Sequence, residues 1–170
     1  PPKDVDSSER LNTHITGVYV PGWIERPVTC ICYTWHDLFP TGGNSVITMV
    51  LKTLCDYAKA HDGTLPSTLH LHMDNCWREN MNKYVLAMAH LLVHHGCFKT
   101  VEICFLPVGH THNIVDQIFS RFAQAMGKKD FFTVDDIHRI CREGYTTTTT
   151  CTCDKRSRKC TWAGIPAHFE

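Results

Sequence analysis

The fold is decided by the stretch from Thr68 to Met126, which reads TLHLHMDNCWRENMNKYVLAMAHLLVHHGCFKTVEICFLPVGHTHNIVDQIFSRFAQAM. Its hydrophobic pattern predicts a strand, a helix, a second strand and a second helix in turn. The predicted elements are a strand over 68–74, a helix over 79–94, a strand over 101–107 and a helix over 113–126. This order of elements is typical of open α/β sheets.

Polar residues gather where the strands of this stretch end. In the first strand polar and apolar residues alternate, so His70, His72 and Asp74 project from one face. The second strand, 101–107, is almost wholly apolar, which predicts that both of its faces are buried. Because chemistry in open α/β sheets collects at the carboxyl ends of strands, we expect the functional site at this edge.

Four further elements flank the central stretch. Strands are predicted over 11–20 and 27–35, and they are expected to pair as an antiparallel hairpin. Helices are predicted over 45–60 and over 133–143. The second of these helices opens with TVDD, a capping box in which Asp136 reaches back to the cap residue.

The length and charge of the chain limit its organisation and its partners. With 170 residues it has the length of about one domain, and we assign residues 1–145 to an α/β domain, a mixed sheet flanked by helices. Residues 146–170 form a threonine-rich linker and a cysteine-containing tail. Because the formal net charge is zero, contact with nucleic acid must rest on a local patch such as the basic residues of 155–159. A solvated basic loop is the plainer interpretation of that patch.

The lack of a signal peptide or membrane span in the sequence, together with its cysteines, predicts an intracellular protein with no membrane partner. No apolar run approaches the roughly 18 residues of a membrane span, and the first ten residues lack the apolar part of a signal peptide. Ten cysteines without an N-glycosylation sequon favour a reducing compartment, including the nucleus. Four thiols fall on apolar faces and are predicted to be core residues: Cys55, Cys97, Cys104 and Cys141.

Asp74 is the first candidate for chemistry. It ends a predicted strand and is followed by Asn75 and a helix, an arrangement in which a carboxylate can hold a divalent cation. Oxygen ligands of this kind suit Mg²⁺ or Mn²⁺. The alternative is that the Asp74-Asn75 pair only turns the chain and caps the following helix.

Asp116 and two histidines form the second candidate group. If the helix begins at Thr111, then His112, Asp116 and Ser120 share one polar stripe. His110 lies beside them. Two imidazoles with a carboxylate are also a plausible set of ligands for zinc or iron, and His72 could be a further ligand. The alternative for Asp116 is a capping role in the first turn of the helix.

A third candidate lies in the tail. Three thiols and an imidazole could make a closed tetrahedral Zn²⁺ site there: Cys151, Cys153, Cys160 and His168. The chain has no glycine-rich phosphate loop, no G-x-S-x-G elbow and no H-E-x-x-H helix, so kinase, hydrolase and zincin functions have no support.

Three segments carry a family resemblance: YTWHDLFPTGGNSVI (33–47), MDNCWRENMNKY (73–84) and LPVGHTHNIVDQIFSRF (106–122). They resemble an uncharacterised eukaryotic domain family that occurs in transposon-like proteins and is thought to have a ribonuclease H-like, retroviral-integrase-like fold. The resemblance implies that Asp74 matches the second acid of that superfamily and Asp116 the third. It also implies that the acids hold two Mg²⁺ ions about 4 Å apart.

The chain departs from the superfamily pattern at the first acid. Residues 11–20 contain neither Asp nor Glu, so we expect 11–20 and 27–35 to be the second and third strands of that fold. The first, central strand would then lie upstream, in a part that this chain lacks. Asp37 is a weak substitute for the missing acid, because it follows a strand expected to lie away from the site.

The resulting hypothesis is a nucleic-acid-processing domain of the transposase or integrase type, acting most naturally on DNA. Asp74 and Asp116 would be metal ligands, and His110 and His112 would assist catalysis. The alternative is a non-catalytic, domesticated binding module that holds a structural zinc ion or a hydrogen-bonded His/Asp cluster.

Overall fold

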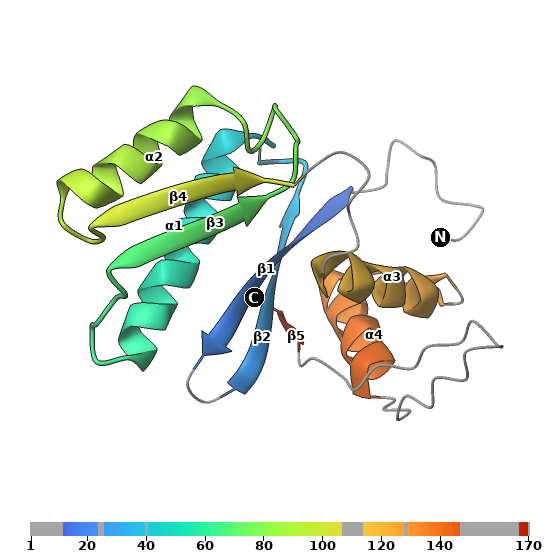
Figure 1. Ribbon diagram of the computed structural model, residues 1–170. Helices are drawn as coiled ribbons and strands as arrows, with labels where there is room; N and C mark the ends of the chain where they lie inside the picture. Colours follow the sequence, from blue (N-terminus) through green and yellow to red (C-terminus); the bar gives the residue numbers. More distant parts are fainter. Residues whose placement is uncertain are drawn as a thin grey trace, which may run out of the picture. The chain divides into compact units, whose positions relative to one another are not determined.

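The computed structural model describes residues 12–23, 26–39, 41–106, 114–127, 129–146 and 167–169 (Figure 1). The described chain is mixed α/β, with two small open sheets flanked by helices. It divides into two compact units, and each is described by itself. No helix in the described ranges is both long and apolar enough to cross a membrane.

The first unit holds a three-stranded sheet in the order β1-β2-β5 and two helices. Its elements are β1 (Thr13–Trp23), β2 (Arg26–His36), α3 (Ile114–Met126), α4 (Val134–Thr146) and β5 (Ala167–Phe169). The two long strands match the predicted hairpin and run in opposite directions (Figure 1). β5 pairs in parallel with β2, with Ile31 opposite His168.

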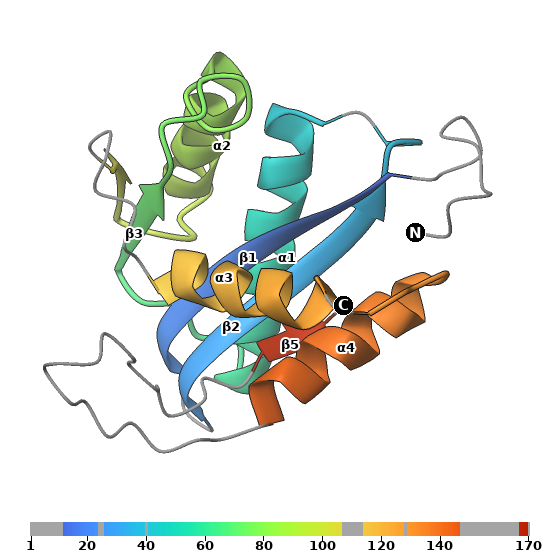
Figure 2. The same cartoon turned by 90° about the vertical axis from the view of Figure 1, so that its right-hand side faces the viewer.

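Helices α3 and α4 pack side by side against this sheet (Figure 2). The buried core between them combines residues of β2, α3 and α4: Cys30, Cys32, Ile118, Phe122, Ile137 and Cys141. Phe122 and Ile118, both of α3, are the largest fully buried side chains of the unit.

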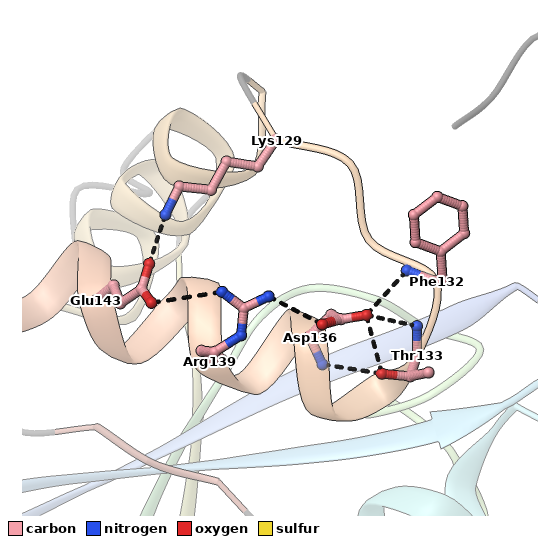
Figure 3. A network of polar contacts seen from close by, with 6 residues as sticks. All are labelled: Lys129, Phe132, Thr133, Asp136, Arg139 and Glu143. Carbon is pink, nitrogen blue, oxygen red and sulfur yellow. Dashed lines mark hydrogen bonds and ion pairs between the residues drawn. The ribbon is translucent and has the colours of Figure 1, made fainter.

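The capping box predicted at the start of α4 is confirmed (Figure 3). The Asp136 backbone N–H donates to Thr133 Oγ1 at 3.1 Å, and Asp136 Oδ2 accepts from the Thr133 N–H at 3.2 Å. The same oxygen accepts from the Phe132 N–H at 3.2 Å. Each half of the box satisfies a backbone donor that the helix itself leaves unpaired.

The second unit holds a two-stranded sheet covered by two helices. Its elements are α1 (Gly43–Ala60), β3 (Thr68–Met73), α2 (Lys83–His94) and β4 (Thr100–Phe105). β3 and β4 pair in parallel, with His70 opposite Glu102 and His72 opposite Cys104. Val50 of α1 and Val85 and Met88 of α2 form one core with the apolar face of this sheet.

Only one face of β4 is covered, so the prediction that both of its faces are buried is wrong. The strand alternates between exposed and half-buried residues, as β3 does. Both helices pack on the face that carries Leu71, Met73 and Ile103. Glu102 and Cys104 therefore lie on the open face.

The burial of individual cysteines differs from the prediction. Cys141 is buried as predicted, but Cys55, Cys97 and Cys104 are exposed. Two cysteines that were not predicted, Cys30 and Cys32, are fully buried in the first unit.

Each sheet keeps an unpaired edge within the described ranges. β1 is hydrogen-bonded to β2 alone, and β3 to β4 alone. A two-stranded sheet is marginal without additional packing, which α1 and α2 supply to β3 and β4.

Candidate functional site

Asp74 follows β3 directly and organises the connection to α2. Its Oδ1 atom accepts hydrogen bonds from the Cys76 backbone N–H at 2.9 Å and from Asn80 Nδ2 at 2.5 Å. The first contact makes an Asx turn, in which a side-chain oxygen takes the place of a backbone carbonyl. The carboxylate is solvent-exposed, and its other oxygen, Oδ2, receives no hydrogen bond from the described residues.

The backbone after Asp74 forms a compact turn. The carbonyl oxygen of Cys76 accepts from the backbone N–H groups of Glu79, Asn80 and Met81, at 3.2, 2.7 and 3.2 Å. This turn occupies positions that the sequence pattern assigns to the start of the helix, so α2 begins at Lys83, four residues after the predicted start.

Asn75 ties the two strand ends together. Its side-chain amide donates to the carbonyl oxygen of Leu106, the residue after β4. The Leu106 N–H in turn donates to the Met73 carbonyl at 3.0 Å. The carboxyl ends of β3 and β4 therefore meet at one edge of the sheet, as predicted, and Asp74 lies at that edge.

Asn82 caps α2 and contacts the start of α1. Its Oδ1 accepts from the backbone N–H groups of Tyr84 at 3.0 Å and Val85 at 3.2 Å. A Cβ atom at Gly43 would lie 2.8 Å from the same oxygen, so any larger residue at position 43 would require the capping side chain of Asn82 to shift. Sequence reasoning missed Asn82, although an asparagine just before a periodic apolar run is a known start signal.

The histidines of β3 lie on the open face of the sheet, in agreement with the predicted alternation. His70 Nδ1 lies 2.9 Å from Glu102 Oε2, and both side chains are more than half exposed. His72 is exposed and stands opposite Cys104 in the strand register. No group of three or more His, Cys, Asp or Glu side chains in the described ranges is placed to hold a metal ion.

Asp116 lies in the first turn of α3 and is exposed. A carboxylate there interacts favourably with the positive end of the helix dipole. Asp116 belongs to the first unit, whereas Asp74 belongs to the second.

The remaining predicted site residues are outside the described ranges. These are His110 and His112, and the three tail cysteines Cys151, Cys153 and Cys160. His168 lies in β5, but its side chain is likewise not described. Asp37 is described and is exposed just after β2.

Comparison with known proteins gives a family but no activity. A family model described as "Domain of unknown function (DUF7869)" matches residues 3–161. Neither the curated proteins nor the solved structures contain a match to the chain.

Proposed function

Since the chain belongs to the DUF7869 family, whose description names no function, we propose one from its residues: metal-dependent phosphodiester cleavage or strand transfer by a ribonuclease H-like domain of the transposase or integrase type. The observation that carries the proposal is the position of Asp74. It is an exposed carboxylate at the carboxyl end of a parallel strand, held by Cys76 and Asn80 through one oxygen only. Ligand sites of open α/β sheets occur at this edge.

The proposed metal ligands are oxygen donors. Asp74 Oδ2 accepts no hydrogen bond from the described residues, and Asp116, which lies in the other unit, is also an exposed carboxylate. Carboxylate oxygens suit Mg²⁺ or Mn²⁺, and bound ions of this kind would activate a water and stabilise a leaving oxygen. His110, His112 and His72 would be auxiliary groups in this proposal.

A second candidate function is a non-catalytic binding module. It is favoured by the turn around Asp74, because a carboxylate that accepts from Cys76 and Asn80 already has a structural role. In this alternative any tightly bound metal is zinc, held by cysteine or histidine side chains such as those of the tail: Cys151, Cys153, Cys160 and His168.

The test is a calorimetric titration of metal-free protein with Mn²⁺, comparing wild type with Asp74→Asn and Asp116→Asn. Asparagine keeps an oxygen for Cys76 and Asn80, so Asp74→Asn removes the charge while the turn is retained. Asp62→Asn is the matched control, since Asp62 is exposed, lies two residues after the end of α1 with φ 52° and tolerates asparagine.

We expect Mn²⁺ affinity to fall by at least about tenfold in both site variants and to stay unchanged in Asp62→Asn. The companion variant Asp74→Ala also removes the turn and should cost about 1 kcal/mol in the free energy of unfolding. If Asp74→Asn bound Mn²⁺ as wild type does and only Asp74→Ala lost stability, the role of Asp74 would be purely structural. That result would favour the binding module.

A further inference from the structure

Two histidines stand in line on the outer face of α2. His90 and His94 are four residues apart and both are exposed. Their rings stack with centroids 6.1 Å apart and an interplanar angle of 15°. Residues four apart on a helix lie one above the other, so both imidazoles project from the same face.

This face has no role in the core of the unit. The core side of α2 is formed by Val85, Met88 and Ala89, which are buried. The two histidines lie on the opposite side and contact each other rather than the sheet. Packing therefore does not explain them.

The end of α2 also favours a cation. The helix stops in a Schellman arrangement, in which the Cys97 N–H donates to the Leu92 carbonyl at 2.9 Å and the Gly96 N–H to the Val93 carbonyl at 3.0 Å. This arrangement fixes the last turn, which carries His94. The helix dipole places partial negative charge at this end.

We propose that His90 and His94 form a two-imidazole site for a divalent transition metal ion. Imidazole nitrogens suit Ni²⁺, Cu²⁺ and Zn²⁺, whereas the oxygen ligands of the Asp74 loop suit Mg²⁺ and Mn²⁺. With two protein ligands, water completes the coordination, and the ion exchanges readily. This site is independent of the function proposed above.

A third imidazole adjoins the pair. The ring of His95 meets that of His94 edge to face, with centroids 5.3 Å apart and an interplanar angle of 76°. His95 is the C-cap residue, and its backbone N–H donates to the Leu91 carbonyl. Its ring orientation differs from that of the stacked pair, so the site is assigned to His90 and His94.

Nickel is the appropriate probe. The chain has exposed thiols, among them Cys97 close to the histidines, and thiolates bind zinc strongly. Copper would oxidise thiols, whereas Ni²⁺ prefers imidazole without this reaction. Reduced, metal-free protein is titrated with Ni²⁺ by calorimetry, and wild type is compared with His90→Ala and His94→Ala.

We expect each variant to bind one Ni²⁺ ion fewer per chain, or to bind it at least about tenfold more weakly. Alanine is the best helix former, so both variants keep α2. His70→Ala, which removes another exposed histidine of the same unit, should bind Ni²⁺ as wild type does. Cys97→Ser should also bind Ni²⁺ as wild type does.

Thermal unfolding supplies a second readout. An ion that binds only the folded helix stabilises it, so Ni²⁺ should raise the melting temperature of wild type and not that of His94→Ala. Unchanged nickel binding in both alanine variants overturns the proposal. An equal loss in Cys97→Ser or His70→Ala overturns it too, because the ligands would then be other side chains. Mn²⁺ binding at Asp74 should be unaffected by His90→Ala.

Discussion

At the scale of single residues, short polar side chains shape the connections around the sheet of the second unit. Asp74, Asn75, Asn80 and Asn82 all lie within nine positions of one another, and each bonds to a backbone group. They satisfy donors and acceptors that the ends of β3 and α2 would otherwise leave unpaired. The turn is therefore built by side chains that replace regular backbone bonding, which is why the helix starts late.

Asp136 makes the clearest electrostatic contribution of a single residue (Figure 3). The Arg139 guanidinium, the Phe132 N–H and the Thr133 hydroxyl lower the pKa of Asp136 to about 2. A second contact joins Arg139 to Glu143, whose pKa is lowered by Lys129. These groups are exposed and screened, so their ion pairs add little individually.

The lowered pKa of Asp136 predicts a specific dependence of stability on pH. Because the folded pKa lies below the unfolded one, the contribution of Asp136 is complete above about pH 4 and is lost as the pH falls to about 2. Asp136→Asn should therefore destabilise the protein at neutral pH and have little effect near pH 2. Urea unfolding at several pH values measures this difference.

Asp135→Asn is the matched control, since Asp135 is an exposed neighbour in the same turn and takes no part in the box. If the free energies of unfolding of Asp136→Asn and wild type differed by the same amount at every pH in this range, the charge of Asp136 would not be the cause of the destabilisation.

At the scale of elements, Gly17 allows α3 to approach β1. A Cβ atom at Gly17 would lie 2.9 Å from Val115 Cγ1 and 3.4 Å from the ring of Phe119. The first distance is too short for any ordinary carbon contact. The glycine is therefore explained by close packing between a strand and a helix that are far apart in the sequence.

Gly17→Ala should destabilise the first unit by about 1–3 kcal/mol, the usual cost of overpacking. Val115→Ala in the same chain removes the clashing methyl group, so the double variant should lose less than the sum of the two single variants. Chemical denaturation of the four proteins gives the coupling energy. If the effects of the two substitutions on the free energy of unfolding were strictly additive, Gly17 and Val115 would not be in contact.

A second element-level contact joins α4 to β2. Thr34 Oγ1 and His138 Nε2 lie 3.0 Å apart. Burial lowers the pKa of His138, and the nearby Arg142 lowers it further. His138 therefore favours its neutral form in this contact, which suits a hydrogen bond with a hydroxyl group.

At the scale of the whole molecule, the two units differ in how they use cysteine. The first unit buries Cys30, Cys32 and Cys141 in its core. The hydrogen bond with Cys30, together with burial, raises the pKa of Cys32, and burial raises the pKa of Cys141 to about 11. The second unit leaves Cys55, Cys97 and Cys104 exposed.

This division predicts two reactivity classes. Brief alkylation of the native protein at neutral pH, followed by mass spectrometry, should label Cys55, Cys97 and Cys104 and spare Cys30, Cys32 and Cys141, because burial keeps the reagent away from the last three thiols. Labelling in denaturant should reach all six and serves as the control. Rapid native labelling of Cys141 would contradict the packing of α4.

The sequence by itself determined the features that depend on neighbours a few positions away. The alternation over 68–74, the helix over 45–60 and the capping box at Thr133 were all predicted correctly. Each follows from helical or strand periodicity, or from a hydrogen bond within one turn. The position of Asp74 at the end of its strand followed from the same local pattern.

Only the tertiary structure decided which surfaces are covered and which distant groups meet. It placed both helices of the second unit on one face, which exposed Glu102 and Cys104 despite the apolar pattern of their strand. It also joined Asn75 to Leu106, 31 residues away. The physical reason is that burial and long-range hydrogen bonds depend on which elements pack together, and no periodicity within one element contains that information.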